Sequence, residues 1–108
     1  MMFRKKGAAD RRQIAEGVFL QTLVHGDKTL MGRFDLAQGA AIPSHTHLHE
    51  QTGFLLSGKL RLKCQGRAWE AQSGDSWCIP GGVEHAVDVL EDAVAIEVFS
   101  PVRDDFLE

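Results

Sequence analysis

The chain has 108 residues, with 12 basic and 15 acidic side chains and a formal net charge of −3. This length supports one domain with one core and excludes a two-domain enzyme. Its hydrophobic content of 44% and charged content of 25% are typical of a globular protein and exclude a wholly disordered chain.

The charge is unevenly distributed. Beyond Ala68 the only base is Arg103, so the chain lacks the folded basic face that nucleic acids need as a partner. No run of about 18 apolar residues and no apolar signal segment occurs, which predicts no membrane partner and a cytoplasmic location. We expect residues 1–14 to form a solvated basic leader and residues 15–108 to form a single barrel domain. The bases of this leader region are Arg4, Lys5, Lys6, Arg11 and Arg12.

Short segments of alternating polarity, separated by glycine-containing turns, predict strands along most of the chain. Residues 18–24 end at the turn signal His25-Gly26-Asp27, and residues 29–36 restart with apolar side chains on one face, which indicates a hairpin. In residues 59–64 bases alternate with apolar side chains, the pattern of a half-buried strand. Further strands are predicted over residues 67–71, 76–79, 85–90 and 93–99.

Turn signals recur about every ten residues, and no long helical pattern interrupts them, which predicts an all-β sandwich or barrel. Residues 93–99 carry apolar side chains on both faces, so both faces should be covered. We expect the second cover to be another copy of the chain, in a homodimer. Cys64 and Cys78 lie in apolar strand patterns and are predicted to be buried free thiols.

Two blocks of sequence predict a metal site. The first reads Gly-x5-His-x-His-x3-Gln-x6-Gly from Gly39 to Gly58, and the second reads Gly-x5-Pro-x-Gly-x2-His from Gly74 to His85. Histidines two apart on an extended strand share a face, so two of them can reach one ion. Three imidazoles and an amide oxygen suit one divalent transition metal ion (Zn, Ni, Fe, Mn or Co) and leave room for substrate. The predicted ligands are His45, His47, Gln51 and His85.

The two blocks resemble the paired signature motifs of the cupin family. This resemblance extends over roughly residues 17–103 and implies a double-stranded β-helix, a jelly-roll-like barrel that holds a metal ion and usually forms homodimers. Two positions depart from the family pattern, because Gln51 replaces the usual Glu and Val89 replaces the usual Asn. Neutral ligands leave a divalent ion its full +2 charge, which favours Lewis-acid chemistry on an anionic, oxygen-rich substrate over oxygen chemistry.

Residues 45–51 and 97–107 resemble more narrowly the small cupins of pectin and alginate breakdown, which promote the opening of unsaturated uronate sugars to linear keto forms. This resemblance implies a pocket lined by Glu97, Phe99 and Arg103, although the acid is usually Asp. Arg103 would bind a carboxylate through its planar fork. Glu97 would act as acid or base if burial raised its pKa.

Each predicted pocket residue also has a purely structural interpretation. Glu97 could pair with Arg103 or another base, and Phe99 could be a core residue. His49 has the parity of the ligands but lies in the link between strands, which places it at the surface or at the pocket rim. Trp77 could stack on a sugar or pack inside a strand pair.

The leading functional hypothesis is a metal-dependent enzyme of the lyase or isomerase type that acts on a small polar or carboxylated, sugar-like substrate. One alternative is an Fe(II)-dependent dioxygenase, because three histidines with open coordination positions suit iron. The other is a module that binds a small molecule without catalysis, since a barrel by itself is only a pocket.

Overall fold

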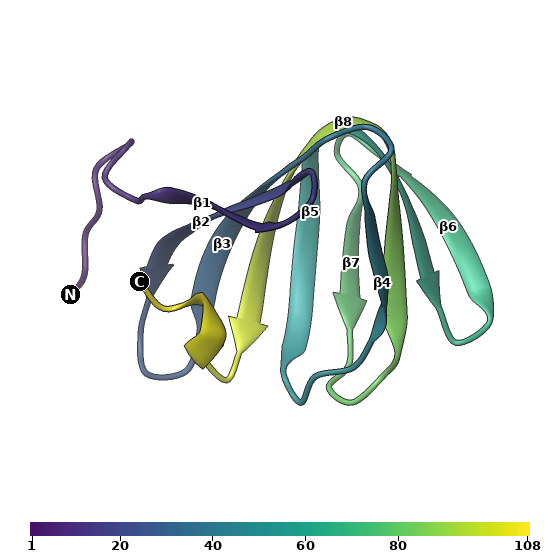
Figure 1. Cartoon of the computed structure of the whole chain (residues 1–108). Helices are drawn as coiled ribbons and strands as arrows, with labels where there is room; N and C mark the ends of the chain where they lie inside the picture. The colour runs from purple at the N-terminus through teal and green to yellow at the C-terminus, as the bar shows by residue number, and fades with distance from the viewer.

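The computed structural model describes all residues from Met1 to Glu108, and almost every regular element is an antiparallel strand (Figure 1). The strands are β1 (Arg11–Ala15), β2 (Val18–His25), β3 (Leu30–Leu36), β4 (Ala41–His45), β5 (Glu50–Cys64), β6 (Arg67–Gln72), β7 (Ser76–Ile79) and β8 (His85–Ser100). A single 3₁₀ turn, η1 (Asp104–Phe106), follows β8. No helix is long and apolar enough to cross a membrane.

Two long strands, β5 and β8, pair with each other along most of their length within one eight-stranded sheet. The first half of β5 pairs with β7 and its second half with β6. In the same way, β8 pairs first with β4 and then with β3, which leads on to β2 and β1. This arrangement is a double-stranded β-helix, and it confirms the predicted all-β barrel.

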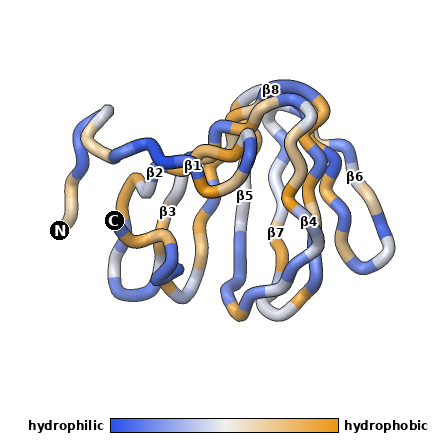
Figure 2. The backbone as a smooth tube through the Cα atoms, viewed as in Figure 1, coloured by the Kyte–Doolittle hydropathy of each residue, from blue (hydrophilic) through white to orange (hydrophobic).

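The predicted hairpin and half-buried strands are confirmed. β2 and β3 pair antiparallel around the expected turn, and in β5 the even-numbered Leu60 and Leu62 are only 2% and 9% exposed. Figure 2 shows the corresponding interspersion of hydrophobic and hydrophilic residues along the strands. The segments predicted as separate strands over residues 85–90 and 93–99 form one strand, β8, because the acidic pair between them stays in the ladder: Glu91 pairs with Lys59.

The pairing of β5 with β8 shifts register between Leu55 and Leu60, where the partners of β5 change from β7 to β6. Gly58 lies at this point with φ +88°, a left-handed conformation that side chains rarely adopt. A Cβ atom at this position would also collide with the backbone of Asp92 and Ala93 on β8. The motif glycine therefore lets the two long strands cross closely.

The sequence predicted a leader over residues 1–14, and in the structure β1 (Arg11–Ala15) begins within this segment, crosses its predicted boundary and pairs with β2. Most side chains of β1 are exposed, so this strand is held by its backbone ladder and has no polarity alternation that the sequence could reveal. Upstream of β1, Arg4 lies 2.6 Å from Glu108, which joins the two ends of the chain on one side of the barrel (Figure 1).

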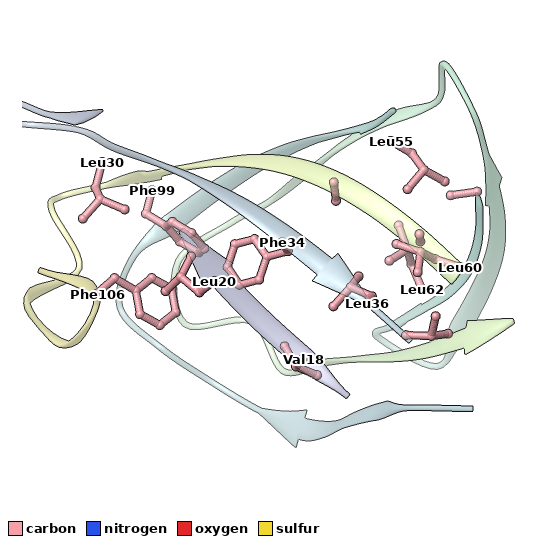
Figure 3. Close-up of a cluster of buried hydrophobic side chains, with 14 residues drawn as sticks. Val18, Leu20, Leu30, Phe34, Leu36, Leu55, Leu60, Leu62, Phe99 and Phe106 are labelled. Carbon is pink, nitrogen blue, oxygen red and sulfur yellow. The ribbon is translucent and has the colours of Figure 1, made fainter. Parts of the chain in front are cut away.

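The hydrophobic core has an aromatic end formed by Phe34, Phe99 and Phe106 (Figure 3). Their rings meet edge to face, with centroids 6.3 Å apart for Phe34 and Phe99, 5.9 Å for Phe34 and Phe106, and 5.3 Å for Phe99 and Phe106. The buried hydroxyl of Thr22 on β2 donates a hydrogen bond to the carbonyl of Phe106. The ring contacts of Phe106 and this hydrogen bond attach η1 to the barrel and so position the segment that carries Arg103.

The outer face of the sheet formed by β3, β8 and β5 carries exposed apolar side chains beside an ion pair between Arg33 and Asp35 on β3. Met31, Phe54 and Leu56 are 37%, 43% and 47% exposed, and they flank the half-buried outward side chains of β8. In the ladder Met31 pairs with Val98, and Phe54 pairs with Ile96. The chain itself therefore covers only the inner face of residues 93–99.

Both cysteines are free, as predicted, but their predicted burial is wrong. Cys78 is exposed and Cys64 is only partly buried. On β7 the neighbours Trp77 and Ile79 point inward, which turns Cys78 outward because side chains alternate along a strand. The short apolar run around Cys78 concealed this alternation.

Candidate metal centre

The four predicted ligands lie in or beside two neighbouring links, β4–β5 and β7–β8, at the lower edge of the barrel in Figure 1. His45 ends β4, Gln51 is the second residue of β5, His47 lies in the link between them, and His85 begins β8. His45 and His85 are direct partners in the ladder of β4 and β8. The amide of Gly82 donates to the carbonyl of His47 over 2.8 Å and holds the two links together.

The three histidines form one cluster whose candidate ligand atoms all lie within 4.8 Å of one another. The ring centroids are 4.3 Å apart for His45 and His85, 4.9 Å for His47 and His85, and 5.5 Å for His45 and His47. Residues far apart in sequence are thus brought to a separation that one ion can bridge.

Hydrogen bonds to the backbone orient all three rings in the same way. The Nδ1 atoms of His45, His47 and His85 lie 2.9, 3.0 and 2.8 Å from backbone carbonyl oxygens two residues away. A carbonyl can only accept, so each Nδ1 carries the proton and donates it. Each neutral ring therefore presents the lone pair of Nε2 to the cluster, which is the tautomer that a metal requires.

Burial keeps two of these rings neutral. It lowers the pKa of both His47 and His85 below the ordinary 6.5, and the positive charge of Arg103 lowers the two values further. The Nε2 atom of His85 is buried and has no hydrogen-bond partner. A buried acceptor without a partner is costly, and a bound cation would satisfy it.

Gln51 completes the set with an oxygen. Its side chain is 8% exposed, and its Nε2 donates to Oε2 of Glu97 over 2.7 Å, so its Oε1 faces Nε2 of His47 at 3.1 Å. Because His47 carries its proton on Nδ1, two acceptors face each other at this distance with no proton between them. A cation bound by both atoms would remove this repulsion, so the residues present fit a divalent metal ion.

A cavity of about 450 Å³ is lined by three of the predicted ligands, His45, Gln51 and His85, and by three predicted pocket residues, Glu97, Phe99 and Arg103. Phe99 is 2% exposed and belongs to the core as well as to the cavity wall. Arg103 donates from Nε and Nη2 to the carboxylate of Asp105 over 3.0 and 2.6 Å. Its guanidinium lies over the rings of Phe106 and Phe99, at 4.0 and 5.1 Å from their centroids.

Glu97 does not form the ion pair with Arg103 that was one interpretation of the sequence. Its two oxygens accept hydrogen bonds from Trp77 Nε1 and Gln51 Nε2, each over 2.7 Å. Burial raises the pKa of Glu97 to about 7, against the opposing effects of these two hydrogen bonds and of Arg103. Near neutral pH this carboxyl therefore exists in both protonation states.

His49 and Trp77 do not line this cavity, and neither does His47. The ring of His49 is 5.5 Å from that of His47, but His49 does not belong to the cluster of candidate ligands. Its carbonyl instead orients His47. Trp77 reaches the site through its hydrogen bond to Glu97, while its ring lines a separate pocket between β6 and β7, together with Trp69 and Leu62.

Sequence reasoning missed Asp105 and Phe106, which hold Arg103 in place. These residues follow the last strand in a segment without periodic polarity, so no strand pattern could indicate where their side chains point. The opposite charges of Arg103 and of the two acids after it, and the aromatic Phe106, were the only signals available.

Comparison with known proteins agrees with this geometry. Residues 32–100 match the Cupin domain family, which is more than half of the chain. The chain belongs to the cupin family. This cupin is 28% identical over 97 residues to the pectin degradation protein KdgF of Dickeya dadantii (strain 3937), a similarity that covers 88% of each chain.

Solved structures of similar fold include KdgF from a Halomonas species, with a TM-score of 0.92, 26% identity and 99% of each chain covered. An RmlC-like cupin from Shewanella frigidimarina NCIMB 400 has a TM-score of 0.93 at 24% identity, over 99% of this chain and 96% of the other. These comparisons confirm the predicted fold and the resemblance to the cupins of pectin degradation.

Proposed function

We propose that this cupin is a metal-dependent enzyme of the isomerase or lyase type that acts on a small, carboxylated, sugar-like substrate. The observation that carries the proposal is the content of one cavity: candidate metal ligands, a carboxyl group whose pKa is about 7, and an arginine fixed by its neighbours. The similarity to a pectin degradation protein supports a uronate as the substrate.

His45, His47, Gln51 and His85 would hold the metal ion. When bound, such an ion supplies Lewis-acid polarisation of a hydroxyl or carbonyl oxygen of the substrate. All four donors are neutral, so the protein leaves the charge of a divalent ion undiminished and strengthens its attraction for anions.

Arg103 is the group that would bind the substrate carboxylate. Two of its nitrogens are engaged by Asp105, which keeps the guanidinium plane in a set orientation and leaves Nη1 for a ligand. The rings of Phe99 and Phe106 support the same plane from the protein side. A guanidinium held in this way loses little conformational entropy when it binds an anion.

Glu97 would move the proton. Its raised pKa, about 7, lets the carboxyl group take up or release a proton near neutral pH, which is the requirement for general acid–base catalysis. Ring opening of an unsaturated uronate and its conversion to a linear keto form needs such a transfer between oxygen and carbon. Arg103 would orient the substrate for this step.

The test is turnover of unsaturated galacturonate, followed by the loss of the ultraviolet absorbance of its conjugated double bond. We expect turnover by the metal-loaded protein, loss with a chelator, recovery on adding a divalent metal, and no turnover by His47→Ala. Leu48→Ala is the matched control, because Leu48 lies in the same link but is 71% exposed. Undiminished turnover by His47→Ala would refute the proposal.

The three histidines also suit Fe(II), so an iron-dependent dioxygenase is the second candidate. Oxygen consumption that requires ferrous iron and a substrate would favour it. A ligand recovered unchanged after long incubation with the metal-loaded protein would instead favour a binding module.

We further propose that the protein forms a homodimer through the outer face of β3, β8 and β5. Met31 on β3 and Phe54 and Leu56 on β5 are exposed there, beside the half-buried Val98 and Ile96 of β8. Exposed apolar side chains grouped in this way are stabilised by contact with a second copy.

A further inference from the structure

Gly53, two residues beyond Gln51 on β5, lies between two residues of the site. In the sheet it pairs with Glu97 on β8 and with Trp77 on β7. A Cβ atom at Gly53 would collide with Oε1 of Glu97 and with the indole ring of Trp77. Its φ is not in the left-handed region, so backbone conformation does not require glycine here. The missing side chain provides space.

The space above Gly53 contains a chain of hydrogen bonds. Trp77 Nε1 donates to one oxygen of Glu97 and Gln51 Nε2 donates to the other, both over 2.7 Å. Glu97 and Trp77 meet directly over the glycine, because each is its lateral neighbour in the sheet. With a side chain at residue 53, neither group could occupy its observed position.

These hydrogen bonds determine which end of the Gln51 amide faces the histidines. In its ionised form the carboxylate of Glu97 only accepts hydrogen bonds, so the NH₂ group points to Glu97 and Oε1 points to His47, as the distances show. The reversed amide would place an oxygen against the carboxylate and an N–H donor against the histidine cluster, which would repel a cation. The amide therefore acts as an oxygen ligand only because Glu97 holds its nitrogen.

We propose that Gly53, Trp77 and Glu97 form a positioning unit that fixes the amide of Gln51 so that its carbonyl oxygen faces the three histidines. Glu97 acts through Gln51 in this role, apart from any proton transfer to substrate. The inference rests on the metal centre of the proposed function but not on its substrate or its reaction.

The test measures metal binding alone, without substrate. Metal-free protein is titrated with Co(II), and the affinity and the visible absorption bands, which report the ligands and their geometry, are recorded. In Glu97→Gln the new amide accepts from Trp77 through its oxygen and presents NH₂ to Gln51, which draws the carbonyl of Gln51 away from the histidines. We expect Co(II) affinity to fall about 10- to 100-fold, with altered bands.

Two variants keep the carboxyl group of Glu97 and change its surroundings. Gly53→Ala forces Glu97 and Trp77 apart and should weaken Co(II) binding by a similar factor. Trp77→Phe removes one donor and keeps most of the ring, so a smaller loss is expected. Gly26→Ala is the matched glycine control, because a Cβ atom there meets nothing within 4 Å and the φ of Gly26 is not positive; it should bind Co(II) like the wild type.

The double variant Gln51→Glu/Glu97→Gln tests the direction of the hydrogen bond between residues 51 and 97. In this variant the amide oxygen at residue 97 accepts a hydrogen bond from Trp77, and the NH₂ group at residue 97 donates one to the carboxylate at residue 51. That carboxylate presents an oxygen to the metal in either orientation. We expect Co(II) affinity at or above that of the wild type.

Circular dichroism of the metal-free variants checks that they fold. If Gly53→Ala does not fold, Glu97→Gln, Trp77→Phe and the double variant test the proposal. Wild-type affinity and bands in folded Glu97→Gln would overturn the proposal. So would a loss confined to Glu97→Gln, with Trp77→Phe and Gly53→Ala unchanged, because the charge rather than the position of Glu97 would then be responsible. Failure of uronate turnover with these Co(II) results intact would contradict only the proposed reaction.

Discussion

Replacing Phe106 tests whether η1 and the C-terminal segment are a structural part of the site. Phe106 is 8% exposed and contacts the rings of Phe34 and Phe99, with its own ring under the guanidinium of Arg103. Truncating a buried phenylalanine to alanine costs about 3–5 kcal/mol through lost burial and the cavity left behind. A domain of this kind has a total stability of about 5–15 kcal/mol, so Phe106→Ala should be severely destabilised.

Phe106→Leu separates packing from aromatic contacts. Leucine fills much of the same volume but loses two edge-to-face pairs, each worth about 0.5–1.5 kcal/mol. It also loses the contact with Arg103, worth about 0.5–1 kcal/mol at a partly exposed site. We therefore expect Phe106→Leu to cost about 2 kcal/mol, clearly less than Phe106→Ala.

The assay is equilibrium denaturation by urea of metal-free protein, with the slope of the transition monitored for constancy. A loss below about 1 kcal/mol in Phe106→Ala would refute the reasoning, because such a loss is typical of an exposed rather than a buried position. In that case the segment would be frayed in solution, and Arg103 would lack its support.

Three further predictions concern the metal, the arginine and the outer face. Protons compete with the metal for Nε2 of His47 and His85, whose pKa values burial lowers below 6.5, so Co(II) affinity should fall as the pH is lowered through the range below 6.5; an affinity that stays constant in that range would contradict this. Arg103→Lys keeps the charge but loses the planar fork, so KM for a carboxylated substrate should rise about tenfold while Co(II) affinity stays unchanged, and an unaltered KM would exclude Arg103 from substrate binding. Phe54→Lys places a charge on the exposed outer face, and light scattering after size-exclusion chromatography should change from dimer to monomer; a wild-type protein that is monomeric at high concentration would rule out the proposed interface.

Polarity alternation predicted most of the strands because side chains along a half-buried strand are buried at every second position, as Leu60 and Leu62 illustrate. The same reasoning failed where burial does not alternate. β1 is held by its backbone ladder with its side chains mostly exposed, and at Cys78 an apolar run hid an outward-facing residue. In both cases the deciding contact is made by a neighbouring strand.

The candidate ligands could be named from the sequence, because the spacing of two motifs singles out His45, His47, Gln51 and His85. The parity argument itself does not hold, since His47 lies in the link after β4 and not on a strand. The orientation of the donors depends on contacts between distant residues. Gln51 takes its orientation from Glu97, 46 residues away, and Glu97 is held in turn by Trp77, 20 residues away. Such partners meet through strand register across β5, β7 and β8, and register depends on the packing of the whole barrel rather than on local sequence.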